Sequence, residues 1–198
     1  MAHGSTAYPT PQQDERAVDY TFSATELNEI QKHVAKYPDK TSAVMPALWI
    51  AQEKFGVLST GAIQLVANTL GLSYAHVYGV ATFYTMYLKM PVPAEPFHLL
   101  EVCTCFTCGE CGGRQVYDHA LQSLQVGEDG FSADGKFYVR EAECLGACDT
   151  PVVLQLNNRR MVFNTDPARL DEVVAQLRRG EEPPFQAVPA IAEREYKA

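Results

Sequence analysis

Several features that would define a class of function are missing from this 198-residue sequence. No run of apolar residues approaches the roughly 20 that span a bilayer. Acids outnumber bases, and the net charge of −8 argues against nucleic acid or an anionic membrane as a partner. We therefore expect a chain that docks on other proteins and does not insert into a membrane.

Targeting and nucleotide-binding signals are also missing. The first twenty residues are polar and lack both the basic-then-apolar order of a secretory signal and the arginines of a transit peptide. The chain has no G-x-G-x-x-G after a strand, no P-loop, and no Ser/His/Asp arrangement of any specificity. We expect a cytoplasmic, reducing location, where structural disulfides are rare, and no NADH or flavin site on this chain alone.

The pattern that is present predicts two domains. After a polar tail over 1–20, residues 21–90 show four segments with helical periodicity, the first opened by a capping box of Ser23 and Glu26. We expect the fourth helix to run from Ser73 to Lys89. Three prolines in MPVPAEP then mark a linker at 91–96. The first domain is thus predicted to be a helical bundle.

The second predicted domain, residues 97–180, has the order strand, helix, strand, strand, strand, helix. Its third and fourth strands form a hairpin that turns at Asn157-Asn158, and its last helix opens at Asp166-Pro167. A small mixed sheet with two helices accounts for this order, as in thioredoxin-like α/β folds. The overall class is therefore α+β, and residues 181–198 are interpreted as a C-terminal tail.

All six cysteines lie in two short segments, each of which follows a predicted strand. VCTCFTCGECGG (102–113) holds Cys103, Cys105, Cys108 and Cys111, and ECLGACDTP (143–151) holds Cys144 and Cys148. Sites in α/β sheets gather beyond the carboxyl ends of strands, so the two segments are expected to meet. Their glycines allow a close backbone approach to sulfur.

Three chemistries suit such thiols: a tetrahedral zinc site, an iron–sulfur cluster, and disulfide exchange through Cys105/Cys108 or Cys108/Cys111. The four-residue and three-residue gaps are looser than zinc knuckles usually are, and two separated pairs suit the two irons of a [2Fe–2S] cluster. Spacing therefore favours iron–sulfur only slightly. A zinc-stabilised adaptor and a thiol–disulfide oxidoreductase stay open as alternatives.

Residues 23–179 resemble the thioredoxin-like [2Fe–2S] subunit of NADH:quinone oxidoreductase, respiratory complex I. The resemblance is carried by HVYGVATFYTMY, by EVC followed by four residues and Cys108, by ECLGAC and by PVVLQLN. It implies one [2Fe–2S] cluster held by Cys103 and Cys108 on one iron and by Cys144 and Cys148 on the other. Cys105 and Cys111 fall outside that set; we interpret them as spare thiols, with ligand exchange or a regulatory pair as alternatives. Spacing alone also allows Cys105 to replace Cys103 or Cys108.

The same resemblance implies a function in electron transfer. The chain would exchange single electrons with the flavin of a partner subunit that carries FMN and NADH, and would contact other subunits of the peripheral arm. That places it on the cytoplasmic face of the inner membrane, through the complex. Related NAD-linked hydrogenase and formate dehydrogenase modules use similar subunits, so the final electron acceptor stays open.

Overall fold

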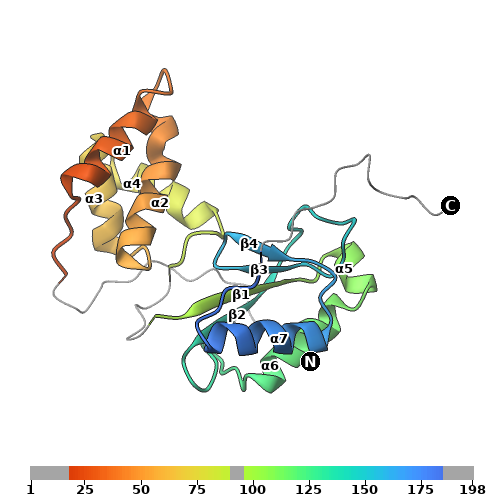
Figure 1. Cartoon of the computed structure of the whole chain (residues 1–198). Helices are drawn as coiled ribbons and strands as arrows, with labels where there is room; N and C mark the ends of the chain where they lie inside the picture. Colours follow the sequence, from red (N-terminus) through yellow and green to blue (C-terminus); the bar gives the residue numbers. More distant parts are fainter. Residues whose placement is uncertain (1–17, 90–95, 185–198) are drawn as a thin grey trace. The chain divides into compact units, whose positions relative to one another are not determined.

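The computed structural model describes residues 18–89 and 96–184, which form two compact units divided between residues 93 and 94 (Figure 1). That division falls in the predicted linker. Most of the predicted linker and of the two predicted tails lies outside the described residues. No helix in the described part of the chain is long and apolar enough to cross a membrane.

The first unit is a helical bundle, as predicted. It contains α1 (Ala24–Val34), the short 3-10 helix η1 (Lys40–Ala43), α2 (Val44–Phe55), α3 (Thr60–Leu70) and α4 (Tyr74–Phe83). The predicted capping box is confirmed: Ser23 Oγ accepts from the Glu26 N–H at 3.3 Å, and Glu26 Oε2 accepts from the Ser23 N–H at 2.6 Å. Gly71 ends α3 in the left-handed conformation, with a φ of +60°.

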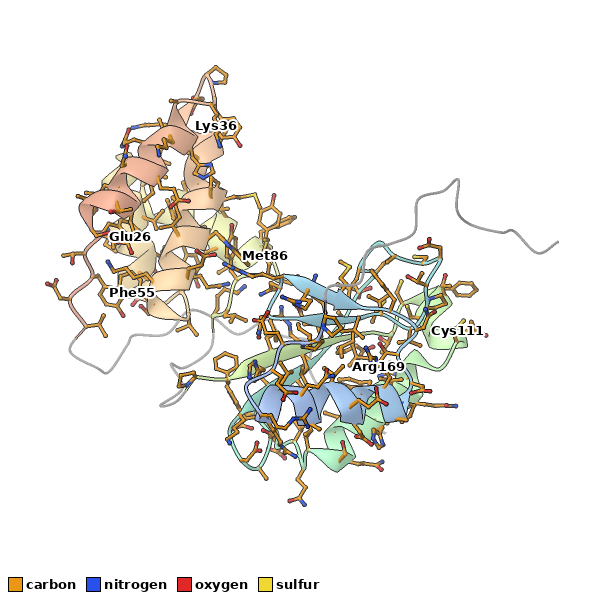
Figure 2. All side chains as sticks on the ribbon, viewed as in Figure 1. Glu26, Lys36, Phe55, Met86, Cys111 and Arg169 are labelled. Atoms are coloured by element: carbon orange, nitrogen blue, oxygen red, sulfur yellow. The ribbon has the colours of Figure 1, made fainter. Side chains whose placement is uncertain are left out.

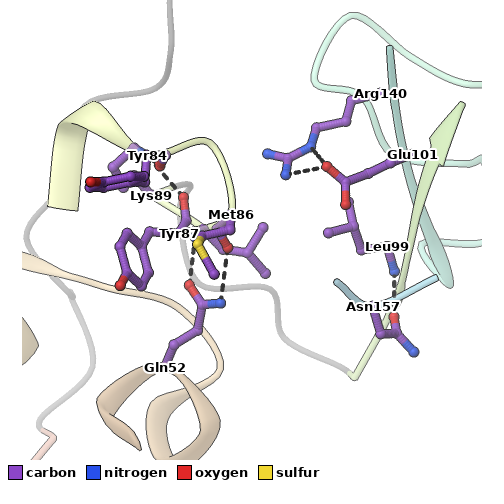
Figure 3. A network of polar contacts seen from close by, with 10 residues as sticks. Gln52, Tyr84, Met86, Tyr87, Lys89, Leu99, Glu101, Arg140 and Asn157 are labelled. Carbon is purple, nitrogen blue, oxygen red and sulfur yellow. Dashed lines mark hydrogen bonds and ion pairs between the residues drawn. The ribbon is translucent and has the colours of Figure 1, made fainter. Parts of the chain in front are cut away.

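The predicted extent of the fourth helix is wrong. Helix α4 ends at Phe83, and Tyr84 is extended, with φ −90° and ψ 131°. The segment that follows finds tertiary partners in place of helical hydrogen bonds (Figure 3). The Gln52 side chain donates to Met86 O at 3.2 Å and accepts from the Leu88 N–H at 2.6 Å. Since Gln52 is nearly buried, these bonds are shielded from water and compete well with continued helix.

Two further buried polar groups hold this segment within the first unit. Lys89 is 2% exposed, and its Nζ donates to Tyr84 O at 3.1 Å and to Tyr87 O at 2.9 Å (Figure 3). The Tyr87 hydroxyl donates to Met45 O at 2.9 Å. Burial raises the pKa of Tyr87 far above its usual range, so this hydroxyl stays a donor at any physiological pH.

The second unit is a four-stranded mixed sheet with helices. Its elements are β1 (His98–Cys103), α5 (Phe106–Glu110), α6 (Gly113–Ser123), β2 (Phe137–Ala142), β3 (Leu154–Leu156), β4 (Arg160–Val162) and α7 (Pro167–Arg178). The sheet order is β2-β1-β3-β4; β1 pairs parallel with β2, and β3 is antiparallel to both of its neighbours. The α+β class and the predicted element order are confirmed. Helix α5 was not predicted from the sequence, because its five residues are too few to show a helical period.

Local signals in the second unit also appear where they were predicted. Asn157 and Asn158 turn the hairpin with φ of +51° and +56°. The Asn157 side chain accepts from the Leu99 N–H at 2.8 Å, which fixes the hairpin to β1 (Figure 3). Asp166 caps α7 by accepting from the Arg169 N–H at 2.7 Å.

The core of this unit lies where α6 and α7 cover one face of the sheet (Figure 1). Leu100 and Val102 of β1 pack there with buried residues of both helices. Glu101 points to the opposite face and is 5% exposed. It accepts from Arg140 of β2 at 2.8 Å (Nε) and 2.5 Å (Nη2) (Figure 3). Such a buried pair costs desolvation, so losing one partner is expected to destabilise the unit strongly.

Candidate metal centre

The parallel pairing of β1 and β2 brings the two cysteine segments together. Cys103 is the last residue of β1 and pairs in register with Ala142, the last residue of β2. The next N–H along, that of Thr104, donates to Ala142 O at 3.2 Å. Cys144 follows two residues after Ala142. Both segments therefore leave the same edge of the sheet, as the sequence predicted.

A polar network on the surface ties this edge to α6. Glu141 of β2 accepts from the hydroxyl of Thr104, and its Oε1 and Oε2 accept from Arg114 at 2.9 Å and 3.3 Å. Arg114 lies in the first turn of α6. The Arg114 and Glu141 side chains are exposed, so their ion pair adds little stability. The network does fix the direction in which the chain leaves β1.

The other three cysteines of the first segment lie at the start, in the middle and at the end of helix α5. Cys105 is its N-cap, Cys108 lies within it, and Cys111 is its C-cap. Cys108 turns inward and is 2% exposed, whereas Phe106 is 82% exposed. Cys111 is exposed beside α5 (Figure 2). The short helix thus presents Cys108 to the interior and carries Cys111 to its other end.

Gly113 lets the backbone of this segment close up. A Cβ at this position would lie 2.6 Å from Cys103 O and 2.7 Å from Cys108 O, closer than real Cβ contacts allow. Only glycine fits between the end of β1 and α5 without moving one of them.

In the second segment, the backbone folds around one sulfur. Gly146, with φ of +80°, directs its N–H to Cys144 Sγ at 3.4 Å. Cys148 Sγ lies 3.3 Å from Cys144 Sγ. The Gly146 N–H, and after it the Cys148 thiol, lower the pKa of Cys144, while the same contact with Cys144 raises the pKa of Cys148. Cys144 therefore gives up its proton before Cys148 does.

The buried pair behaves differently. Burial raises the pKa of the Cys108 thiol to about 11, although a hydrogen bond from the Val153 N–H opposes that effect, and the neighbouring Cys103 thiol raises it further. Cys103 is 2% exposed and its own N–H donates to Val153 O at 3.0 Å. A positive partner such as a metal would offset this cost of burial and favour the Cys108 thiolate.

Contacts among the thiols join the two segments into one site. The Cys108 thiol bonds to that of Cys103 and lies close enough to Cys148 for the charge of that thiol to raise the Cys108 pKa, so Cys103, Cys108, Cys144 and Cys148 lie near one another. Cys105 lies near enough to contribute, as the smallest of the named causes, to the lowered pKa of Cys144. Each pair that the family resemblance implies for one iron is also a pair of interacting thiols.

The donor set fits an iron–sulfur group. All its ligating atoms are sulfur, and N–H groups of Gly146 and Val153 point at two of them. Within residues 18–89 and 96–184, no group of three or more His, Cys, Asp or Glu side chains is close enough to hold a metal ion as the side chains stand. A two-iron centre places two cysteines on each iron, and the two contacting pairs meet that requirement.

A thioredoxin-like sheet with two pairs of cysteines just beyond the ends of two neighbouring strands is typical of one class of iron–sulfur protein. Comparison with known families agrees: residues 30–178 match the model of the thioredoxin-like [2Fe–2S] ferredoxin family, and the chain belongs to that family. The match spans both units of the structure.

Individual relatives share most of the chain. It is 37% identical to an NADH-quinone oxidoreductase subunit of Rhizobium meliloti, over 79% of this chain and 91% of the relative. It is 34% identical to NADH-quinone oxidoreductase subunit 2 of Thermus thermophilus, over 76% of this chain and 83% of the relative.

A solved structure of an NAD+-reducing [NiFe]-hydrogenase in the H2-reduced state is similar over 67% of this chain, with a TM-score of 0.55 and 17% identity. This chain corresponds to only 22% of that hydrogenase chain, and the similarity concerns the fold alone.

Proposed function

We propose that this chain is the electron-transfer iron–sulfur subunit of an NADH:quinone oxidoreductase. Support comes from relatives that are NADH-quinone oxidoreductase subunits, at 34% and 37% identity over most of both chains. The observation that carries the proposal is the meeting of two contacting thiol pairs at one sheet edge in a member of this family. The chain would work as one subunit of the oxidoreductase, without a complete active site of its own.

The proposed ligands of one [2Fe–2S] cluster are Cys103 and Cys108 for one iron, and Cys144 and Cys148 for the other. When bound, such a cluster supplies a carrier that accepts and gives up one electron at a time. The residues of the chain hold it asymmetrically, because the first pair is buried and the second is exposed. We infer that the second pair faces the partner that exchanges electrons.

The N–H groups of Gly146 and Val153 have a defined task in this proposal. Four thiolates bring a concentrated negative charge, and N–H dipoles aimed at Cys144 and Cys108 offset part of it. Such hydrogen bonds to sulfur also help to set a cluster's reduction potential.

A partner subunit must supply the flavin and NADH sites. NADH gives up electrons in pairs as hydride, so a flavin has to stand between NADH and a one-electron carrier. The sequence has no dinucleotide-binding fingerprint. We therefore propose that FMN and NADH bind to a partner subunit that this chain contacts, together with other peripheral-arm subunits on the cytoplasmic face of the inner membrane.

The alternatives have less support. The hydrogenase similarity rests on the fold alone, so it does not favour an NAD-linked hydrogenase or formate dehydrogenase over complex I. A zinc-stabilised adaptor and a thiol–disulfide oxidoreductase have no relative of that description among the similar proteins described above. The following experiment distinguishes both alternatives from an electron-transfer protein, because neither of them predicts an iron–sulfur cluster.

The test is the visible absorption spectrum of the purified full chain, followed by EPR after dithionite reduction. We expect a red-brown protein with a spin-one-half signal, and loss of both in C108A and C148A. C111A is the matched control, because Cys111 lies on the same short helix as Cys108 but at its exposed end. A colourless chain that carries one zinc would overturn the proposal, as would an unchanged spectrum in C108A.

A further inference from the structure

A single carboxylate at the cysteine edge of the sheet holds both ends of the first cysteine segment. Glu141 accepts a hydrogen bond from the Thr104 hydroxyl and two from the Arg114 guanidinium. Thr104 stands near the start of that segment, directly after Cys103, and Arg114 follows its last residue, Gly113. The segment is therefore tied to β2 near its beginning and just beyond its end by one side chain.

The same residue stands close to the second cysteine segment. Glu141 is the last residue but one of β2, three residues before Cys144. The backbone reinforces the tie, because the Thr104 N–H donates to Ala142 O at 3.2 Å. Thr104 thus bonds to β2 through its N–H and through its hydroxyl, which fixes both the position and the orientation of the chain as it leaves β1.

Arg114 binds the carboxylate with a fork of two nitrogens. Its Nη2 lies 2.9 Å from Glu141 Oε1, and its Nη1 lies 3.3 Å from Oε2. Such bidentate pairs add geometric specificity to a charge interaction. The centroid of the Tyr117 ring, which is nearly one turn further along α6, lies 5.8 Å from Arg114 Cζ and supports the guanidinium. The start of α6 is thereby held in a defined direction relative to β2.

This tie adds little to the stability of the fold. The side chains of Arg114 and Glu141 are 57% and 42% exposed, and exposed ion pairs contribute little to folding. Residues that orient metal ligands without touching the metal behave differently, because their loss typically costs about 10- to 100-fold in metal affinity or activity. A tie of small folding value, placed between two segments of proposed ligands, therefore matches a positioning role.

We propose that Glu141 is a positioning residue for the iron–sulfur site. It holds the buried pair, Cys103 and Cys108, at the separation from the exposed pair, Cys144 and Cys148, that one cluster requires. This inference rests on the proposed function and deepens it. Glu141 acts through the Thr104 hydroxyl on the first segment and through β2, which leads into the second. Without the tie, each segment keeps its own fold but the two lose their fixed separation.

The experiment measures how fast an iron chelator removes the cluster from the full chain after anaerobic reconstitution with iron and sulfide. E141A removes every bond of the tie, and its cluster should be lost at least about tenfold faster than that of the wild type. T104V removes only the hydroxyl and keeps the shape of the side chain, so its rate should lie between the two. T104S keeps a hydroxyl and should retain a rate near that of the wild type.

The matched control is E181A, which removes another exposed ion pair at the opposite end of the strands. Glu181 accepts from Arg179 at 2.7 Å, and both side chains are exposed. Arg178, at the end of α7, donates to Asp134, which lies just before β2, whereas the cysteine segments follow the strand ends. E181A should therefore lose its cluster at the wild-type rate.

Two further measurements separate a positioning role from a general loss of stability. The urea midpoints of the apo chains of E141A and E181A should agree, because each variant loses one exposed ion pair. After dithionite reduction, the EPR line positions of E141A and T104V should differ from those of the wild type, because they report the geometry of the ligands. Those of E181A should not differ.

A wild-type rate of cluster loss in E141A overturns the positioning role, and so does an equal acceleration in E141A and E181A. If E141A does not fold, T104V decides, and a wild-type rate and EPR signal in T104V then contradict the proposal. A wild-type chain that takes up no cluster overturns the proposed function itself, and the inference with it. A cluster-bearing wild type with unchanged variants overturns the inference alone.

Discussion

Replacement of Gly113 by alanine should open the cysteine site while leaving the first unit intact. The added Cβ would lie 2.6 Å from Cys103 O and 2.7 Å from Cys108 O, where real Cβ atoms stay beyond 3.0 Å. Both contacts are with backbone, so no side chain can rotate away. The end of β1 and the helix α5 must separate, and each carries a cysteine of the buried pair.

The magnitude follows from the packing. Inserting a methyl group into a close-packed site costs about 1–3 kcal/mol, and contact with two backbone carbonyls places this change near the upper end. To reach ordinary contact at 3.4 Å, each carbonyl must retreat by about 0.7–0.8 Å, whereas ligands of a working site must be held within about 0.5 Å. We therefore expect a drop of about 3 kcal/mol in the stability of the second unit and a reduced cluster content.

The assay uses urea unfolding followed by two probes. Far-UV circular dichroism reports on the whole chain. The fluorescence of Trp49, the sole tryptophan, reports on α2 of the first unit. For G113A, the transition of the second unit should move to lower urea, while the Trp49 transition stays in place. Iron content and EPR after reconstitution measure the effect on the site.

The matched control is G79A. A Cβ at Gly79 meets nothing within 4 Å, and the residue lies inside α4, where alanine is favoured over glycine by about 0.5–1 kcal/mol. G79A should therefore leave the second unit unchanged and slightly stabilise the first. A G113A chain with wild-type cluster content and stability within about 0.5 kcal/mol of wild type would show that the close approach at Gly113 does not exist.

Three further changes test other parts of the structure. S23A removes the capping box of α1 and should cost about 1 kcal/mol, visible as an earlier Trp49 transition; an unchanged midpoint would contradict the cap. R140A leaves the buried carboxylate of Glu101 without its partner and should lower the free energy of urea unfolding by about 3–5 kcal/mol. A much smaller decrease would show that water solvates the Glu101–Arg140 pair. Burial lowers the pKa of His98, so the unfolded chain binds the proton more tightly than the folded chain does. The stability contribution of neutral His98 should therefore be complete above the unfolded pKa of about 6.5 and decrease as the pH falls below it. H98N should flatten this dependence of the unfolding free energy between about pH 7.5 and 5.5.

The sequence predicted most local elements because their signals are local. The capping box at Ser23, the Asn157-Asn158 turn and the proline-led helix after Asp166 each depend on neighbouring residues only. The end of the fourth helix was placed wrongly for the opposite reason. The residues after Phe83 keep helical periodicity, but Gln52, more than thirty residues earlier, bonds the backbone of that segment in another conformation.

For the cysteine site too, one part could be predicted from the sequence and another part depends on tertiary structure. The motifs carried the resemblance and the four proposed ligands, because a spacing along the chain and its neighbouring residues are properties of the sequence alone. Which thiols come together depends on tertiary structure: the register of β1 with β2 sets the distance between the segments, and α5 buries Cys108 while Cys111, at its end, stays exposed. The sequence by itself thus determined the kind of chemistry. The fold decided that the two cysteine segments meet there, because contacts between residues far apart in the sequence are made only by the packed sheet.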